Sequence, residues 1–371
     1  MRMPKRGRSP RAFSIGILRK LVGSEDLQMK KLLSLLMALA LMATLTACGG
    51  DKTSGGDDSS APTETGDSSG TEAVDTDTVA VGAVVIARDD VPEDDVYTFV
   101  STIFENTDTI TEQHAKGGEL DLNFAASMTS VPYHPGAAKY FSEKGIEVAA
   151  VKEGAGSGES KALNFGTGNE SGTYYAFGGV LSSYVTNNSD LSVTAVTSGG
   201  SKANIEDLTA GDTQLGFVQS DVMSYAYNGE RLFDAPVEGF SVVAALYMEQ
   251  VQLVTTNPDI KSVADLAGKT VSVGDMGSGV FFNAVDVLGA YDIDVESGIS
   301  PVYQNFGDSA ESLKDKKIDA AFIVAGAPTT AIVDLATSGP VYLVSLDDEH
   351  TNALLESSPY YSAYTIPAGT Y

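Results

Sequence analysis

The chain has 371 residues, enough for about two or three domains. Its formal net charge is −27, and the first 47 residues hold nine Lys or Arg against two Asp or Glu, so the remainder is more acidic still. A chain this acidic disfavours nucleic acids and anionic membrane surfaces as partners.

A secretory signal is expected over residues 29–47. Two lysines precede the apolar run LLSLLMALALMATLTA, which is shorter than the roughly 20 residues that a membrane-spanning helix needs. The run ends in the letters LTAC, which resemble the lipobox of bacterial lipoproteins. This resemblance implies a lipid anchor on Cys48 and an extracytoplasmic location at the bacterial cell membrane. The alternative is a buried core helix with a chance cysteine.

The segments on either side of this signal have their own composition. Residues 1–28 are basic, and we expect them to lie upstream of the true start at Met29 and outside the mature protein. Residues 48–78 are acidic and nearly lack large apolar side chains. Such a segment cannot bury enough surface to offset its ordering entropy, so a flexible tether is predicted.

Apolar runs and helical periodicities then predict the following elements in chain order. The first group is a strand over 79–87, a helix within 93–115, a helix over 136–144 and a linker over 151–160. The second group is strands over 163–167, 192–197 and 214–219, alternating with helices over 173–185, 202–210 and 220–227. The third group is strands over 251–256, 269–275, 299–304 and 319–325, alternating with helices over 262–267, 280–288, 308–316 and 330–337.

This alternation predicts parallel sheets covered by helices in three-layer α/β form. Because the pattern occurs in two successive blocks, the simplest architecture is two lobes with a cleft between them. Loops at the carboxyl ends of the strands would face that cleft.

Four strand ends share an unusual construction. NFGTGNESGTYY, TSGGSKAN, QSD and GDMGSGVFFNA each follow a predicted strand and open a predicted helix. Glycines allow a ligand to approach the backbone closely, and the first helical turn presents unpaired N–H groups that suit an anion. The turns match neither the Walker loop nor the dinucleotide fingerprint. Taken singly, each is equally compatible with an ordinary tight turn, but together they point to a small anionic or zwitterionic ligand.

Charged side chains near these turns are few. Arg88 and Arg231 are the two arginines after Cys48, and neither lies in a turn, so an arginine clamp on a carboxylate is not indicated. Asp221 and Asp275 do lie in the turns, where each could pair with a ligand ammonium or serve as a helix N-cap.

The sequences GTGNESGTYYAFGG, VTSGGSKANIEDLTAGDTQLGFVQSD, VSVGDMGSGVFFNA and DAAFIVAGAPTTAI resemble the TAXI family of extracytoplasmic solute receptors that serve TRAP transporters. The resemblance implies a two-lobed fold like that of type II periplasmic binding proteins, closing at a hinge on a small carboxylate or amino acid. Glutamate-like and 2-oxo acid ligands are associated with the family. The implied partners are the solute, the TRAP membrane subunits and the membrane, through the lipid on Cys48. The ligand-binding residues expected from the turns are Thr167, Ser171, Thr173, Tyr174, Ser198, Gly200, Ser201, Gln219, Ser220, Asp221, Gly277, Ser278 and Gly279.

The order of the segments departs from that family. Its members begin with the glycine-rich strand and end with a segment like residues 79–145, which here comes first. The sequence is therefore interpreted as circularly permuted, which nearby surface termini would make tolerable. One lobe would then combine 79–150 with 161–255, and the other would hold 256–371.

Three rival functions remain open. A receptor of this fold could instead serve an ATP-driven importer or a membrane sensor. A structural lipoprotein that has lost binding is a second possibility. An enzyme is the third, but the three histidines lie outside the turns, the one cysteine lies in the lipobox, and none of the turns contains a G-x-S-x-G elbow. We therefore expect no cofactor, no metal and no catalytic residue.

Overall fold

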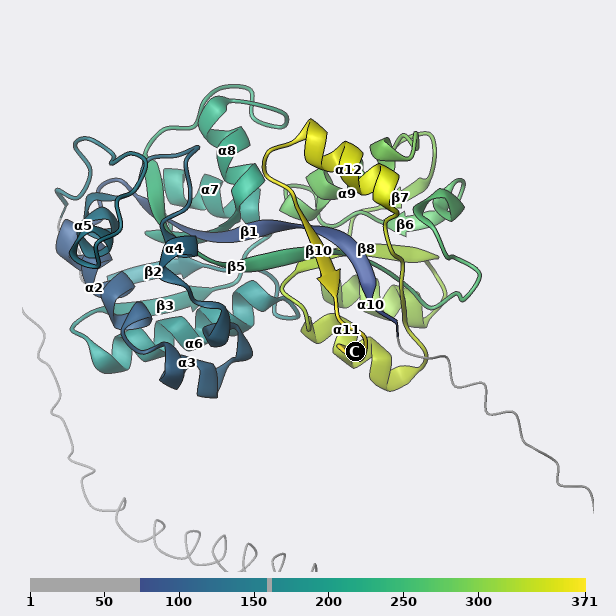
Figure 1. The fold of residues 1–371 in the computed structure, drawn as a ribbon, viewed down its shortest axis with the longest axis horizontal. Coiled ribbons are helices and arrows are strands. Elements are labelled where there is room, and N and C mark those ends of the chain that lie inside the picture. Colours follow the sequence, from purple (N-terminus) through teal and green to yellow (C-terminus); the bar gives the residue numbers. More distant parts are fainter. Residues whose placement is uncertain (1–73, 159–161) are drawn as a thin grey trace, which may run out of the picture. The chain divides into compact units, whose positions relative to one another are not determined.

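Two long strands, β1 (Thr76–Arg88) and β5 (Phe240–Thr255), lie side by side in antiparallel register and extend through both halves of the folded chain (Figure 1). The computed structural model describes residues 74–158 and 162–371, all within one unit spanning 70–371. The expected signal, Cys48 and residues 49–73 of the tether lie outside the described residues. β1 begins at Thr76, three residues inside the range expected for the tether.

The described strands form one sheet in the order β3-β2-β4-β1-β5-β8-β6-β7, with β10 beside β1 and β9 beside β5. On one side, β2, β3 and β4 are parallel to one another, and on the other side β6, β7 and β8 are parallel. β1 and β5 are antiparallel to the neighbours that they join. These strands are β2 (Ala162–Gly166), β3 (Ser192–Val196), β4 (Leu215–Gln219), β6 (Thr270–Ser272), β7 (Ser300–Val302), β8 (Ala320–Ala325), β9 (Tyr342–Leu343) and β10 (Ser362–Ile366).

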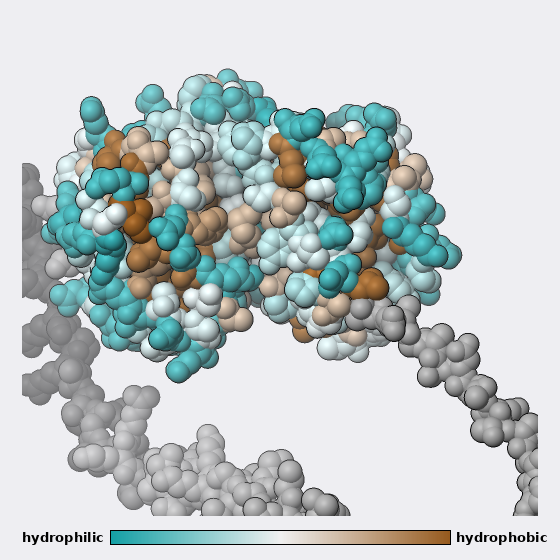
Figure 2. All heavy atoms as spheres, in the orientation of Figure 1, coloured by the Kyte–Doolittle hydropathy of each residue, from teal (hydrophilic) through white to brown (hydrophobic). Residues whose placement is uncertain are grey.

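Helices cover both faces of the sheet in each half (Figure 1). The first half has α2 (Glu93–Phe104), α3 (Thr107–Gln113), η1 (Ala115–Glu119), α4 (Leu122–Ala125), α5 (Pro135–Glu143), α6 (Thr173–Asn188), α7 (Ser201–Ala210) and α8 (Ser220–Asn228). The second half has η2 (Val263–Leu266), α9 (Gly279–Ala290), α10 (Phe306–Lys314), α11 (Thr330–Ser338) and α12 (Asp348–Ser357). On the face drawn in Figure 2, hydrophilic side chains predominate.

The buried apolar residues divide into two clusters, which define two lobes. Lobe 1 contains the cluster from Ala83 to Tyr247, and lobe 2 contains the cluster from Val251 to Tyr361 together with Val79 and Val81. β1 and β5 therefore contribute to both cores, and the chain crosses between lobes near Gly82 and Met248–Gln250. The expected two-lobed, three-layer α/β fold of type II arrangement is confirmed.

Several predicted elements differ in extent. The helix expected within 93–115 is two helices, α2 and α3, because the turn at Glu105 and Asn106 interrupts it. The helix expected over 262–267 is a short 3-10 helix, η2. β5 starts at Phe240, well before the predicted 251–256, and α12, β9 and β10 were not predicted. The run FSVVAALYM is a continuous apolar run of the same kind as the one that predicts β1, so the same signal was present for the first half of β5.

Candidate functional site

Helix N-termini from both lobes meet at the cleft. α6 and α7 follow β2 and β3 in lobe 1, and α9 follows β6 in lobe 2. Within the described residues, the N-cap positions of these three helices receive no side-chain capping hydrogen bond. Their first-turn N–H groups, which have no intrahelical acceptor, are therefore available to a ligand, and the helix dipoles favour an anion there.

A cavity lies between these helix ends, with a volume of about 40 Å³ available to the centre of a water molecule. That is room for a few water centres. Seven of the residues predicted from the sequence line it: Thr173, Tyr174, Gly200, Ser201, Gln219, Ser278 and Gly279. The structure thus brings together parts of the turns before α6, α7 and α9 with the end of β4.

The other predicted residues do not line the cavity. Thr167 and Ser198 bond to backbone carbonyls within lobe 1, at 2.7 Å from Val196 O and 3.3 Å from Thr167 O respectively. The Ser220 hydroxyl accepts from the Gly82 N–H at 3.0 Å. Gly277 adopts a left-handed conformation with φ of 92°, where glycine is favoured, and it shapes the turn before α9. Ser171 lies where lobe 1 contacts lobe 2, its carbonyl accepting from the Ala331 N–H at 3.2 Å.

Asp221 faces the opposite lobe. Its side chain is fully buried, and its Oδ2 accepts from Asn283 Nδ2 on α9 at 3.1 Å. Burial raises the pKa of Asp221 to about 7, and the charge of Asp286 adds to this effect. Asp221 is thus an interlobe group and not part of the cavity wall.

Sequence reasoning missed several lining residues. Gln304, Asn305 and Phe306 follow β7 and open α10, so they share the strand-to-helix construction of the recognised turns. Glu249 lies inside β5, where its signal was a single acidic residue within a buried apolar strand. The remaining lining residues outside the prediction are Gly168, Asn169, Gly172, Gly199, Asp275, Val280, Val324 and Ala325.

The charged side chains at the cavity are acidic. Glu249 is 2% exposed, and its Oε2 accepts from the Tyr174 hydroxyl at 2.6 Å. Burial raises the pKa of Glu249 to about 8. Burial and the charge of Asp308 also raise the pKa of Asp275. Among the described residues that line the cavity there is no Lys or Arg.

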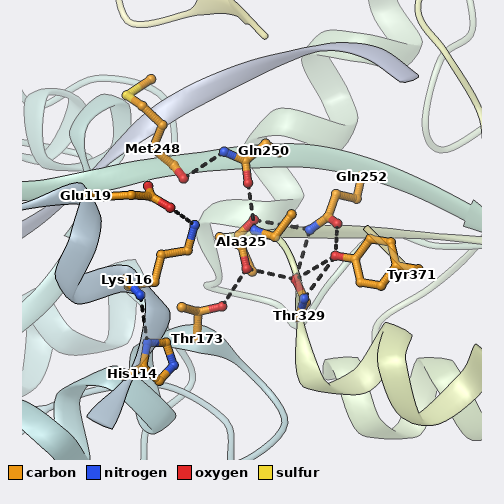
Figure 3. Close-up of polar contacts among 12 residues, drawn as sticks. His114, Lys116, Glu119, Thr173, Met248, Gln250, Gln252, Ala325, Thr329 and Tyr371 are labelled. Carbon is orange, nitrogen blue, oxygen red and sulfur yellow. Dashed lines mark hydrogen bonds and ion pairs between the residues drawn. The ribbon is translucent and has the colours of Figure 1, made fainter. Parts of the chain in front are cut away.

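The two lobes touch around this cavity. The Thr173 hydroxyl of α6 donates to Gly326 O, in the loop after β8, at 2.9 Å. That loop is held within lobe 2 by Gln250, which accepts from the Ala327 N–H at 2.7 Å, and by Gln252 and Tyr371 (Figure 3). The structure is therefore a closed form, with lobe 2 backbone directly against the start of α6.

Two features are absent from the described residues. Within residues 74–158 and 162–371, no group of three or more His, Cys, Asp or Glu lies together in a way that could hold a metal ion. Those same ranges contain no helix of the length and apolarity needed to cross a membrane.

Comparison with protein families matches residues 62–145 and 165–371 to the NMT1-like family. Among solved structures, the alkanesulfonate-binding protein SsuA from Xanthomonas axonopodis pv. citri, bound to MOPS, is 19% identical over 50% of this chain and 61% of its own, with a TM-score of 0.35. The aliphatic sulphonate binding protein SsuA from Escherichia coli is 18% identical over 57% and 63%, with a TM-score of 0.34. The amino acid ABC transporter substrate-binding protein AbpA from Streptococcus pneumoniae, bound to L-arginine, is 14% identical over 50% and 76%, with a TM-score of 0.35. The chain spans less than two thirds of the length of either SsuA protein.

Proposed function

The chain belongs to the NMT1-like family, and we propose that it is an extracytoplasmic solute-binding receptor. In this function its two lobes close on a small carboxylate or amino acid without changing it chemically. The ligand lies in the cavity between the lobes, where first-turn N–H groups of α6, α7 and α9 bind its carboxylate. Closure is coupled to binding because residues of both lobes contact the ligand.

The observation that carries this proposal is the Gln219 side chain. It is 2% exposed and lines the cavity, and its Oε1 has no hydrogen-bond partner among the described residues. A buried polar atom is normally hydrogen-bonded, so an unpaired one at three uncapped helix ends favours a bound polar molecule. Ser201 holds the backbone at this position, because its hydroxyl accepts from the Gln219 backbone N–H at 3.1 Å.

Finer assignments are part of the same proposal. The resemblance of the turns to TAXI receptors supports TRAP membrane subunits as the partner, and the lipobox-like LTAC supports lipid anchoring through Cys48. The permuted order is supported by the pairing of β1 with β10, from Thr76 opposite Ile366 to Ala80 opposite Ser362. A receptor of the same fold for an ATP-driven importer or a sensor is the alternative.

The test is calorimetric titration of the chain from Gly49 onward, since both core clusters lie within it. The ligands are glutamate, glutamine, further amino acids, 2-oxoglutarate and an alkanesulfonate. We expect saturable binding of a carboxylate or amino acid with about micromolar affinity and an unchanged ligand after recovery. Chemical conversion of a ligand, or no binding by folded protein, would contradict the proposal.

A further inference from the structure

Glu249 is placed where it can contact a ligand but not solvent outside the cleft. Successive side chains of a strand point to opposite faces. Accordingly Glu249 lines the cavity, whereas the preceding Met248 lines a separate groove of about 390 Å³ behind the crossing strands, together with Gly82 and Tyr360. β5 passes between the lobes here, so Glu249 forms the floor of the cavity.

The described residues give the Glu249 carboxyl a single hydrogen bond, from Tyr174 in the first turn of α6. The Tyr174 ring stacks on Phe217 with a centroid separation of 4.6 Å and an interplanar angle of 7°, which fixes the hydroxyl. Tyr174 thus links Glu249 to the N-terminus of α6, which suits a carboxylate. The nearby buried ammonium of Lys116 forms an ion pair with Glu119 at 2.5 Å, and Lys116 does not line the cavity.

The wall of this cavity includes buried acceptors that lack a partner in the described part of the chain. The Oε1 atoms of Gln219 and Gln304 are buried without partners among the described residues, and Asp275 adds a second carboxylate. Such a set needs hydrogen-bond donors from the ligand, because an unmet buried acceptor costs about 1–3 kcal/mol. A ligand amine supplies up to three N–H donors and a positive charge, whereas a 2-oxo group supplies one more acceptor.

Building on the proposed function, we propose that Glu249 determines specificity by binding the amine of an α-amino acid, and so discriminates against the 2-oxo acid with the same side chain. The small cavity requires the amine and the carboxylate of the ligand to lie close together, as they do in an α-amino acid. The carboxylate lies at the N-termini of α6, α7 and α9, and the ammonium lies between Glu249 and the two glutamine oxygens.

Pairing between Glu249 and a ligand ammonium should release a proton. With its pKa raised to about 8 by burial, the Glu249 carboxyl of the empty cleft carries a proton at neutral pH. An incoming ammonium favours the carboxylate, so that proton is released to solvent and no bond to the ligand is formed. The other titratable groups that interact with Glu249 are Tyr174, through a hydrogen bond, and Tyr247, Asp221 and Lys116, through their charges. The pKa values of both tyrosines are raised further by burial and remain above the range concerned.

The experiment compares matched pairs by calorimetry: glutamate with 2-oxoglutarate, and leucine with 4-methyl-2-oxopentanoate. Titrations in buffers of different ionisation enthalpy at about pH 7 count the protons released. We expect the amino acid of at least one pair to bind at least about tenfold tighter than its oxo acid, with proton release. Glu249→Gln keeps an acceptor for Tyr174 and should weaken amino acid binding about 10- to 100-fold and abolish the release.

Glu143→Gln is the matched control, since Glu143 also accepts from a tyrosine, Tyr97, at 2.7 Å, but on the exposed surface of α5. It should change neither affinity nor proton release. Tighter binding of the oxo acid would overturn the inference, because it would mean that a protonated Glu249 donates a hydrogen bond to the oxo group. The proposed receptor function would be unaffected by that result. Equal affinity within each pair, or unchanged amino acid binding in Glu249→Gln, would also overturn it. If folded protein binds no ligand of either kind, the proposed function fails as well.

Discussion

Arg231 of lobe 1 and Asp286 of lobe 2 form a two-pronged ion pair across the lobes, with Nη1–Oδ2 at 2.9 Å and Nη2–Oδ1 at 2.5 Å. The guanidinium also lies over the rings of Tyr225 and Phe282, at 5.0 and 5.4 Å from their centroids. Phe282 comes from α9 yet belongs to the core cluster of lobe 1. α8 and α9 are therefore joined by charge and apolar packing next to the bond between Asp221 and Asn283.

Arg231→Ala should shift the ligand-free protein toward an open form. The pair is partly buried, so its loss should cost the closed form about 1–3 kcal/mol, between the values for exposed and buried pairs. We expect a larger radius of gyration by small-angle X-ray scattering and ligand affinity lower by up to about 100-fold. Lys317→Ala, which breaks an exposed pair with Asp315, is the control and should change neither. Equal effects in both variants would argue against an interlobe role.

Gly279→Ala should block full closure. A Cβ at this first residue of α9 would lie 1.7 Å from Gln219 Oε1 and 3.1 Å from Ser201 Oγ, both on the other lobe. Gln219 would have to leave the cavity wall, so ligand affinity should fall more than about tenfold. Thermal stability should be unchanged or slightly higher, because alanine favours the helix.

Gly289→Ala is the matched control for this helix, since a Cβ there meets nothing within 4 Å. It should bind ligand like the unmodified protein. Normal affinity in Gly279→Ala would show that Gln219 and α9 do not approach each other in the bound form.

Asp221→Asn should change the dependence of stability on pH. The pKa of Asp221 is about 7 in the folded protein, above its value in the unfolded chain. The contribution of Asp221 to folding stability is therefore fully present below about pH 4 and is lost as the pH rises through about 7. The asparagine variant lacks this loss. At pH 8 its free energy of unfolding, measured with denaturant, should exceed that of the unmodified protein by at least about 1 kcal/mol. The control, Asp334→Asn, alters an exposed residue of α11 and should leave the profile unchanged.

Ligand affinity gives an independent check on Asp221. Because this side chain does not line the cavity, Asp221→Asn should bind ligand within about threefold of the unmodified protein. A large loss of binding at a pH where both proteins are folded would place Asp221 in the binding site, as its position in the turn first indicated.

Restoring the family order of segments should leave the fold intact. In the structure the Ala368 N–H donates to Asp75 Oδ1 at 2.9 Å, so the two ends of the described chain lie together. A chain opened between residues 158 and 162, with a short linker from Tyr371 to Val74, should retain the circular dichroism spectrum, the melting temperature within a few degrees and the ligand affinity. A molten or insoluble product would contradict the hypothesis that the chain is circularly permuted.

The helices and strands that form the turns were predictable because their signals are local. A β-rich run, a glycine or serine turn and a helical stripe lie within about 25 residues of each other, as from Leu163 to Val185. These local signals identified α6, α7, α8 and α9 and, with them, seven of the cavity residues. The first half of β5 was missed although its continuous apolar run is the kind of signal that predicted β1, which is also buried on both faces.

By itself the sequence determined the two α/β blocks and the positions of the turns, since backbone conformation there follows from neighbouring residues. The tertiary structure alone decided which side chains face the cleft. Glu249 and Met248 are adjacent, and strand geometry with lobe packing sends the first to the cavity and the second behind the hinge. Asp221 bonds to Asn283 and does not line the cavity, because α9 of the other lobe lies against it. The two residues are 62 positions apart in the chain, so no local signal could predict this contact.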